Sequence, residues 1–203
     1  MTLWIAEPLV LASKSAPRRM LLEAAGIPLV IDPADIDERA AEAASPREAA
    51  KPDGAALLLA REKAFETSRR QKGKLVLGAD QTLALGERRY SKPKSLDGAR
   101  EQLLSLSGKM HALHSGIALV RDGEVVFETV STARLTMHAL TDKFLDAYLA
   151  SAGERVMSSV GGYQLESFGV HLFEKIEGDH FTILGMPLLP LLAYCRNAGL
   201  VVS

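Results

Sequence analysis

A hydroxyl-rich segment with two arginines is the first part of the sequence that suits chemistry on an anion. It reads Ser13-Lys14-Ser15-Ala16-Pro17-Arg18-Arg19 and lies between an apolar run and a helix-like run. Small hydroxyl residues let the backbone come close to an anion, free N–H groups at a helix start face it, and arginine binds phosphate through two hydrogen bonds. The segment predicts a phosphate site, although a solvated helix start with surface arginines fits the same residues.

Carboxylates stand at two further places. Asp80, in Gly78-Ala79-Asp80-Gln81, follows an apolar run, and α/β proteins place their chemistry at the carboxyl ends of strands. The acidic run Asp35-Ile36-Asp37-Glu38 offers the oxygen ligands that suit a hard divalent cation with phosphate ligands. A turn-capping aspartate and a solvated acidic loop are the simpler interpretations. Lys63 and Lys92, taken alone, read as surface lysines.

Strands and helices are mixed along the whole chain, which predicts an α/β fold. Short apolar runs and one Asp-Gly turn predict the strands, at 8–12, 28–31, 74–77, 82–85, 117–120, 125–130 and 168–176. Helical periodicity and end signals predict the helices, at 18–25, 54–70 after an Asp53 cap, 95–108, 141–150 and 187–197. The acidic segment 32–51 is expected to be a loop with a short helix, and a moving gate there is a hypothesis.

Composition describes an ordinary globular protein and excludes several classes. The 203 residues are 47% hydrophobic and 24% charged, with a net charge of −1, so nucleic acid and an anionic membrane are not expected partners. The longest uncharged run, 181–195, is too short and too interrupted by proline to span a bilayer. The single cysteine, Cys195, suits a buried core thiol in a reducing compartment. We expect one domain, residues 1–203, in the cytoplasm.

The order of these motifs resembles the Maf family. It begins with Leu11-Ala12-Ser13-Lys14-Ser15 and Arg18, and continues through Asp37-Glu38, Arg61-Glu62-Lys63-Ala64, Gly78-Ala79-Asp80, Lys92-Pro93 and Leu106-Ser107-Gly108-Lys109-Met110-His111. The C-terminal motifs are Gly161-Gly162-Tyr163-Gln164-Leu165-Glu166, Ile176-Glu177-Gly178-Asp179 and Ile183-Leu184-Gly185-Met186-Pro187-Leu188. The likeness runs from about residue 9 to residue 198, nearly the whole chain.

The resemblance implies a nucleoside triphosphate pyrophosphatase, which cuts between the α and β phosphates and releases pyrophosphate. It implies an elongated mixed α/β body with two lobes around a deep cleft, a divalent metal (Mg or Mn), and a possible homodimer. By position, Asp80 matches the proton acceptor, and Glu38 with Asp80 would hold the metal. The phosphate-binding positions match Ser13, Ser15, Arg18, Lys63 and Lys92.

Three positions indicate the nucleotide. The resemblance implies that dTTP/UTP enzymes carry Arg, Thr and Gln where this chain has Pro17, Gln81 and Glu166, and that 7-methyl-GTP enzymes carry a non-Arg residue, Gln and Glu. A carboxylate such as Glu166 accepts the two guanine donors N1–H and N2–H₂ and favours a cationic methylated ring. A mismatched buried polar edge costs about 1–3 kcal/mol, so this choice affects selectivity strongly.

We therefore expect hydrolysis of 7-methyl-GTP. Two alternatives stay open: a dTTP/UTP or broad-range pyrophosphatase, and a nucleotide-binding regulator of septum formation that needs no turnover. The presence of Asp80, Glu38, Lys63 and Lys92 argues against an inactive enzyme. A soluble α/β domain with an unrelated ligand would require many ordered motifs to match by coincidence.

Overall fold

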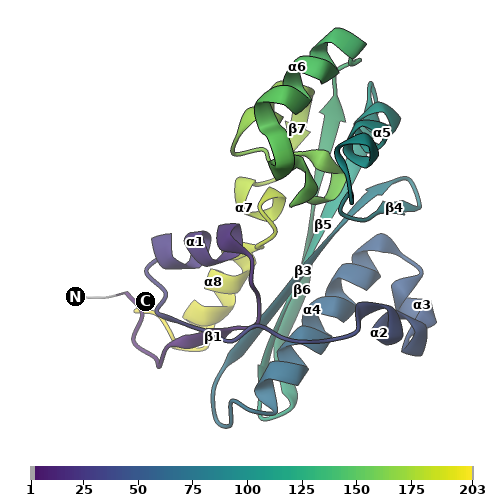
Figure 1. Cartoon of the computed structure of the whole chain (residues 1–203). Coiled ribbons are helices and arrows are strands. Elements are labelled where there is room, and N and C mark those ends of the chain that lie inside the picture. The colour runs from purple at the N-terminus through teal and green to yellow at the C-terminus, as the bar shows by residue number, and fades with distance from the viewer. Residues whose placement is uncertain (1–2, 203) are drawn as a thin grey trace. The chain divides into compact units, whose positions relative to one another are not determined.

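The chain forms two compact units in a computed structural model that describes residues 3–202. Unit 1 comprises Met1–Gln81, His114–Ser131 and His180–Ser203, and unit 2 comprises Thr82–Leu113 and Thr132–Asp179. Helices and strands occur in both (Figure 1), so the predicted mixed α/β class is confirmed. The single domain over residues 1–203 and its deep cleft stay predictions.

The described strands form one hydrogen-bonded sheet in the order β2-β1-β3-β5-β6-β7, with β4 paired to β3. Their bounds are β1 Leu9–Leu11, β2 Leu29–Ile31, β3 Val76–Leu85, β4 Arg88–Tyr90, β5 Met110–Arg121, β6 Glu124–Met137 and β7 Phe173–Glu177. Strand β1 pairs in parallel with β2 and β3, whereas the β3–β4 and β6–β7 pairs are antiparallel. Strands β3, β5 and β6 each contribute residues to both units.

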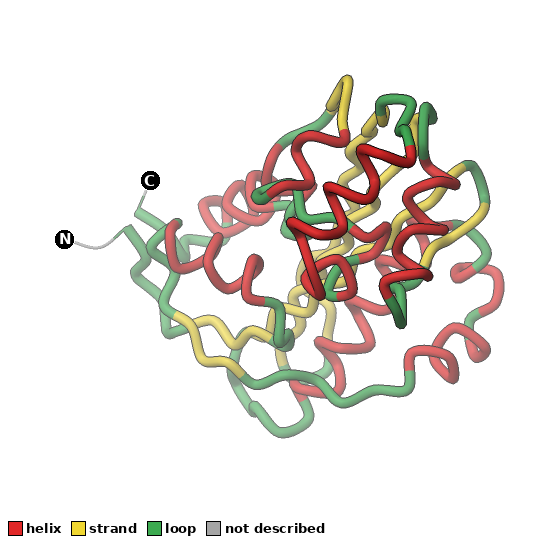
Figure 2. Tube along the Cα trace, turned by 45° about the horizontal axis from the view of Figure 1, so that its top comes forward, coloured by secondary structure: helices red, strands yellow, loops and turns green. Residues whose placement is uncertain are grey.

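Unit 1 is a layered body with helices on both faces of its strands. Its helices are α1 Ala16–Ala24, α2 Glu38–Ala44, α3 Pro46–Ala49, α4 Pro52–Ser68, α7 His180–Ile183 and α8 Leu188–Asn197. Figure 1 shows α1 and α8 side by side, although they come from opposite ends of the chain. The parallel strands β1 and β2 lie together in Figure 2.

The side-chain alternation of the strands explains these layers. Leu9 and Leu11 point into the large core cluster shared with α1 and α8, whereas Val10 and Ala12 belong to a smaller cluster with Ala64 of α4. Successive strand residues face opposite sides, so a strand covered on both faces must be apolar throughout. The continuous apolar run before Ser13 therefore marks a central, fully buried strand.

Unit 2 combines its share of the sheet with a group of helices. These are α5 Leu96–Leu106 and α6 Asp142–Ala152, with the 3₁₀ helices η1 Gly153–Met157, η2 Val160–Gly162 and η3 Phe168–Leu172. Buried leucines such as Leu103 and Leu145 fill the core. His111 lies within this core, where its Nε2 is 2.8 Å from the hydroxyl of Tyr163 and its ring packs against Phe173.

Local signals predicted several element ends correctly. Asp122 and Gly123 both have positive φ, 51° and 84°, as the Asp-Gly hairpin between β5 and β6 requires. The strands on either side extend well beyond the predicted 117–120 and 125–130, because cross-strand pairing continues where the local apolar pattern stops. Cys195 is buried, as expected, and burial raises the pKa of its thiol to about 11.

Some element predictions are wrong. Asp53 does not cap α4, since the helix begins at Pro52 and its cap position is Lys51. Proline suits the first turn because its missing N–H is not needed there. The segment 168–176 is not one strand, because Phe168–Leu172 forms a 3₁₀ helix and β7 begins only at Phe173. Apolar alternation alone did not distinguish these two conformations.

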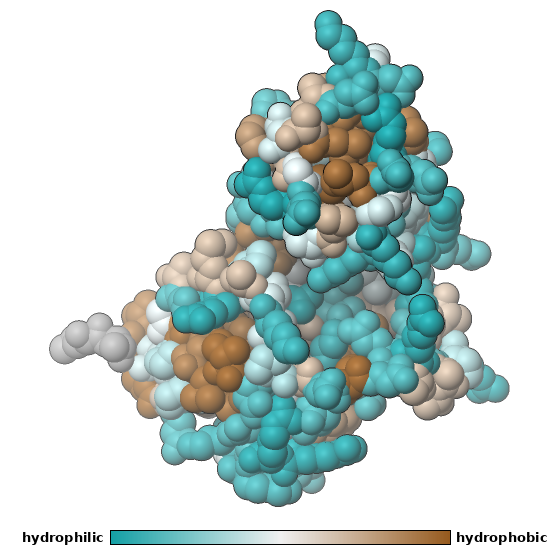
Figure 3. All heavy atoms as spheres, in the orientation of Figure 1, coloured by the Kyte–Doolittle hydropathy of each residue, from teal (hydrophilic) through white to brown (hydrophobic). Residues whose placement is uncertain are grey.

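Part of the apolar surface lies over unit 1. Figure 3 shows brown apolar atoms between teal polar side chains in the region of α1 and α8, and Met20 and Leu189 are among the exposed apolar residues of these helices. Across residues 3–202, every helix is too short or too polar to cross a bilayer.

The buried His111 makes the stability of the protein depend on pH. Burial lowers its pKa from 6.5 to about 4, so below pH 6.5 the unfolded state binds a proton that the folded state does not. We expect the free energy of unfolding to fall by about 2–3 kcal/mol from this residue between pH 7.5 and 4.5. His111→Gln should remove that part of the loss, measured by urea unfolding at both pH values.

The matched control is His138→Gln, since His138 is exposed in the same unit. It should leave the acid loss of stability as in the unaltered protein. Equal acid sensitivity of the His111→Gln and unaltered proteins would show that His111 does not titrate as described.

Candidate active site

Helix α4 approaches strand β3 at backbone distance, and this close contact sets the geometry of the site. A Cβ added to Gly78 would lie 1.9 Å from the carbonyl oxygen of Ala60 and 2.7 Å from the backbone nitrogen of Ala64. A glycine inside a strand marks such an approach of another backbone. Lys63 lies between the two alanines in sequence, and the contact therefore brings it to Asp80, two residues after the glycine.

The ammonium of Lys63 contacts two carboxylates. Its Nζ lies 2.6 Å from Oδ1 of Asp80 and 2.7 Å from Oε1 of Glu38. The side chains of Lys63 and Asp80 are only 16% and 14% exposed, whereas Glu38 is 53% exposed. A charge withdrawn from water this far needs an opposite charge beside it. The structure thus brings together three of the residues singled out in the sequence.

Asp80 lies within β3 and not after the end of a strand, so the prediction that the strand stops at Leu77 is wrong. Strand β1 pairs with β3 up to Leu77, and β4 pairs with it from Leu83. Because β5 is the neighbour on the other edge, β1 and β4 share one edge of β3, and Asp80 lies in the interval between them. The residue therefore sits where the parallel pairing ends, although its own strand continues.

Burial raises the pKa of the Asp80 carboxyl above its usual range. The positive charges of Lys63 and Arg18 act in the opposite direction, and the negative charge of Glu38 adds to the increase. A carboxylate with a raised pKa accepts a proton more readily than an exposed one. Among the described residues of unit 1, Asp80 therefore has the properties that a general base needs.

Arg18 connects three segments of unit 1. Its Nε donates to the carbonyl of Gly185 at 2.9 Å, and its Nη1 donates to the carbonyl of Ala79 at 2.7 Å and to Oγ of Ser13 at 3.2 Å. Its Nη2 makes no hydrogen bond within residues 3–202. Burial lowers the pKa of its guanidinium, and the charges of Asp80 and Glu38 oppose this change.

The two serines of the predicted phosphate segment organise the turn into α1. Ser15 is the N-cap residue, and its Oγ accepts from the backbone N–H of Arg18 at 3.5 Å. Ser13 is buried, and its Oγ accepts from the backbone N–H of Ser15 at 3.3 Å. Both oxygens act as acceptors in these bonds, so each hydroxyl keeps its own proton for another acceptor. Pro17 lies half-buried in the first turn of the helix.

The members of the acidic run have different structural roles. Asp37 caps α2, because its Oδ1 accepts from the backbone N–H groups of Arg39 and Ala40, both at 3.0 Å. Asp35 is exposed. Glu38 alone of these three carboxylates contacts Lys63, and α2 has no buried residue of its own. The acidic run therefore caps α2 through Asp37 and places the carboxylate of Glu38 beside Lys63.

Gln81 continues the site beyond Asp80. Its Nε2 donates to Oγ of Ser115 at 2.9 Å and to the carbonyls of Thr182 and Ile183 at 3.1 and 3.0 Å. Unit 1 therefore brings together Ser13, Ser15, Pro17, Arg18, Glu38, Lys63, Asp80 and Gln81, and the roles assigned to them remain predictions.

The other two predicted residues belong to unit 2. Lys92 lies exposed after β4, and Glu166 lies exposed in the turn between η2 and η3. Within residues 3–202, neither makes a hydrogen bond or an ion pair. That they join the residues of unit 1 around one substrate stays a prediction.

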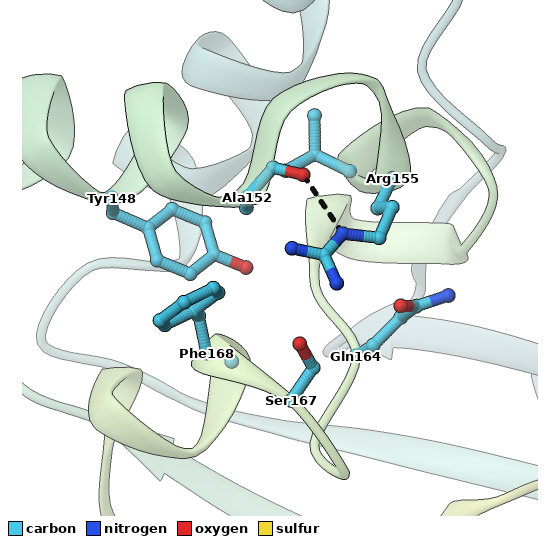
Figure 4. A pocket seen from close by; sticks show the side chains of 8 residues that line it. Tyr148, Ala152, Arg155, Gln164, Ser167 and Phe168 are labelled. Atoms are coloured by element: carbon cyan, nitrogen blue, oxygen red, sulfur yellow. Dashed lines mark hydrogen bonds between the residues drawn. The ribbon is translucent and has the colours of Figure 1, made fainter.

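A small pocket lies beside the turn that carries Glu166. Gln164 and Ser167 of the turn line this pocket together with Phe168 of η3, and Figure 4 shows Phe168 beside Tyr148. The Nε of Arg155 donates to the carbonyl of Ala152. The guanidinium also lies 5.7 Å from the centre of the Phe168 ring. The backbone N–H of Ser167 donates to the carbonyl of Gln164 at 3.2 Å, which closes the turn around Glu166, and the Glu166 side chain is exposed.

Sequence reasoning missed the roles of Gly78 and Ser115. Gly78 carried a signal, since a glycine between buried strand residues indicates a close backbone approach. Ser115 carried none, because only the folding of residues 182–183 onto β5 reveals its hydroxyl as a partner of Gln81.

Comparison with known proteins identifies the family. The family model described as Maf-like protein matches residues 8–198. The chain belongs to the Maf family.

Proteins with two different names resemble it to a similar degree. A nucleoside triphosphate pyrophosphatase of Rhodopseudomonas palustris strain BisB18 is 55% identical over 202 residues, which cover 99% of each chain. A protein with the same name from Bradyrhizobium diazoefficiens is 53% identical, again over 99% of each chain. A 7-methyl-GTP pyrophosphatase of Rhizobium etli is 53% identical over 193 residues, 95% of this chain and 97% of that protein.

The close contact between α4 and β3 predicts that any side chain added at Gly78 lowers the stability of the protein. In Gly78→Ala the new methyl group would meet backbone atoms, which cannot rotate away. We expect a loss of at least about 3 kcal/mol in the free energy of unfolding, measured by urea denaturation.

Gly98→Ala serves as the control for this variant. Gly98 lies in helix α5, and its added Cβ would lie at an ordinary 3.4 Å from Ser95 Oγ. Alanine favours the helix at that position, so stability should stay equal or rise. A melting temperature of Gly78→Ala within about 2 °C of the unaltered protein would contradict the packing described.

Proposed function

We propose that this Maf protein hydrolyses the α–β phosphoric anhydride bond of nucleoside triphosphates, giving a nucleoside monophosphate and pyrophosphate. The observation that carries the proposal is the contact of Lys63 with both Asp80 and Glu38 beside Arg18. A buried carboxylate next to two cations provides a proton acceptor together with positive charge for phosphates. The names of the curated relatives support the same reaction.

In this mechanism Asp80 accepts a proton from the water that attacks the α phosphorus. The water oxygen bonds to phosphorus, the bond to the bridging oxygen breaks, and the electron pair leaves with pyrophosphate. Burial of Asp80 favours this role because it raises the pKa of the acceptor. The rate then depends on keeping the carboxylate ionised before the reaction, which Lys63 and Arg18 help to do.

The cationic and hydroxyl groups neutralise the phosphates. Arg18 has Nη2 available, and Ser13 and Ser15 each keep one hydroxyl proton that a phosphate oxygen can accept. Lys63, and Lys92 from unit 2, would balance the charge that develops on departing pyrophosphate. Preorganised donors of this kind stabilise a transition state without having to reorient.

A divalent metal fits the donor set of unit 1. Asp80 and Glu38 place carboxylate oxygens around the same cationic nitrogen. Within residues 3–202, no group of three or more His, Cys, Asp or Glu side chains is arranged so that it could hold a metal ion without further ligands. Mg²⁺ is typically held by one or two carboxylates together with substrate phosphates and water. We therefore propose Asp80 and Glu38 as its ligands. A bound Mg²⁺ or Mn²⁺ would withdraw charge from the phosphates.

We further propose 7-methyl-GTP as the preferred substrate, on the basis of Pro17, Gln81 and Glu166. An exposed carboxylate on the turn between η2 and η3 of unit 2 can accept both donors of guanine, and the methylated ring adds a positive charge. Two of the curated relatives carry the 7-methyl-GTP name and others of equal similarity carry the general one. The alternative is a dTTP/UTP or broad-range enzyme.

The first test is pyrophosphate release from 7-methyl-GTP, GTP, dTTP and UTP in the presence of Mg²⁺ or Mn²⁺. Asp80→Asn should lower turnover by at least about 100-fold on every substrate, because the amide cannot accept the proton. Asp53→Asn is the matched control, since Asp53 lies exposed in the first turn of α4 and should keep full activity.

Each outcome of this assay decides a different part of the proposal. Highest kcat/KM on 7-methyl-GTP supports the assigned specificity, whereas highest kcat/KM on dTTP or UTP would replace it and leave the reaction intact. Full activity of Asp80→Asn would remove Asp80 from the mechanism. Absence of release from all four nucleotides would leave nucleotide binding without turnover as the better description.

Metal removal provides a separate prediction. Chelation should abolish pyrophosphate release, and Mg²⁺ or Mn²⁺ should restore it. Glu38→Gln should raise the metal concentration at half-maximal activity by at least about tenfold. Loss of a residue that only hydrogen-bonds to a metal ligand already lowers metal affinity by about ten- to a hundredfold, and loss of a ligand should cost at least as much. Asp35→Asn, an exposed neighbour of the same run, should leave that concentration unchanged. Equal metal dependence of Glu38→Gln and the unaltered protein would exclude Glu38 as a ligand.

A further inference from the structure

The amide of Gln81 has only one orientation that the surrounding groups allow. Two of the atoms within hydrogen-bond distance of its nitrogen are backbone carbonyl oxygens, those of Thr182 and Ile183. Carbonyls only accept hydrogen bonds, so the amide nitrogen must face them, and a flipped amide would place oxygen against oxygen. The assignment of the two ends of this side chain therefore follows from its neighbours.

Ser115 completes this arrangement from β5. Its side chain is fully buried, and its hydroxyl donates to the carbonyl of Thr182 at 2.7 Å. The proton of the hydroxyl is thereby committed, and its oxygen accepts from Nε2 of Gln81 at 2.9 Å. Ser115 thus joins Gln81 to Thr182 of helix α7 through two directed hydrogen bonds.

The other end of the amide is left for a ligand. Oε1 of Gln81 makes no hydrogen bond within residues 3–202, and it is absent from the buried polar atoms without partners, so it faces solvent. Successive strand residues face opposite sides, so the Gln81 side chain leaves β3 on the side away from Asp80. A Cβ added to Gly185 would lie 3.2 Å from Nε of Arg18 and 3.7 Å from Cδ of Gln81, so the amide lies close to the guanidinium of Arg18. An oxygen of this kind can only accept a hydrogen bond.

We infer that Gln81 contacts the nucleotide as a fixed hydrogen-bond acceptor and that Ser115 is the positioning residue that fixes it. This inference rests on the proposed function and specifies its substrate class. The ligand group is a hydrogen-bond donor, either an N–H of a purine base or a hydroxyl of the ribose. A nucleotide that presents an acceptor at this point meets a lone pair and loses affinity, because Gln81 cannot rotate to offer its N–H groups.

The positioning role of Ser115 is tested by the selectivity between two nucleotides, because activity on one nucleotide alone would also fall if the fold were damaged. We expect Ser115→Ala to lower the ratio of kcat/KM on 7-methyl-GTP to kcat/KM on dTTP by about three- to tenfold, mainly through KM, because one orienting hydrogen bond is lost. Gln81→Met, of similar length but without an acceptor oxygen, should lower the same ratio by about ten- to a hundredfold. In the Gln81→Met background, Ser115→Ala should have no further effect on the ratio.

A matched control separates positioning from general damage to the fold. Ser68 is another buried serine of unit 1, at the end of α4, where its Oγ accepts from the backbone N–H of Gly123. Ser68→Ala should leave the ratio unchanged. A loss of stability by itself lowers the activity on both nucleotides together and does not move their ratio.

Two substrate analogues identify the donor. If the donor is the amino group of the base, the effect of Ser115→Ala should disappear with the 7-methylated inosine triphosphate, which lacks that group. If it is the 2′-hydroxyl, the effect should disappear with the 2′-deoxy form of 7-methyl-GTP. Either result supports the inference.

Two results would overturn it without touching the proposed function. One is an unchanged ratio in Ser115→Ala while the unaltered protein releases pyrophosphate. The other is an equal additional loss from Ser115→Ala in the Gln81→Met background, which would show that the serine acts independently of the amide. Lack of pyrophosphate release by the unaltered protein would instead reject the proposed function itself.

Discussion

The contact between the backbones of α4 and β3 is the constraint on which the site depends. Gly78 removes the side chain that would separate them, and Gly116 does the same on β5, where an added Cβ would lie 2.6 Å from the carbonyl oxygen of Ala56. Alanines recur at every fourth position on this face of the helix, at 56, 60 and 64. The backbone of α4 therefore packs unusually close to the sheet, and Lys63, beside the alanine face, reaches the carboxylate of Asp80 on β3. An ordinary surface lysine becomes a half-buried one through packing alone.

A second property is shared by Arg18, Ser13, Ser15 and Gln81. Each makes hydrogen bonds within the protein and keeps one further donor or acceptor that no described residue uses. Arg18 uses Nε and Nη1 for the protein and keeps Nη2, the serines keep their hydroxyl protons, and Gln81 keeps Oε1. The groups that we propose to act on a substrate are thus held by bonds that do not involve the substrate. Such preorganisation lowers the cost of ordering the site when the nucleotide binds.

Local sequence signals predicted some of the elements around the site and not others. The hairpin at 122–123 depends on local chemistry and was predicted, as was the helix that contains Lys63. The cap at Ser15 was not predicted, since α1 begins at Ala16 and the helix was expected from residue 18. The continuation of β3 through Asp80 was not, because Gly78-Ala79-Asp80-Gln81 has the composition of a turn and only pairing with distant strands keeps it extended. The link from Ser115 to Gln81 joins residues 34 positions apart and depends on a third segment, so no local pattern reveals it.

The charges of the site support the proposal that a divalent metal binds together with the substrate. Arg18 and Lys63 bring two positive charges, and Asp80 and Glu38 bring two negative charges, so this cluster is close to neutral before anything binds. A triphosphate carries several negative charges, and a neutral cluster attracts it weakly. The chain as a whole, with a net charge of −1, adds no attraction of its own. A divalent cation that arrives with the nucleotide would satisfy the two carboxylates and release the ammonium of Lys63 toward the phosphates. The protein would then bind the metal–nucleotide complex in preference to either component, and the same two carboxylates would serve as a counter-charge for lysine in the free protein and as ligands in the complex.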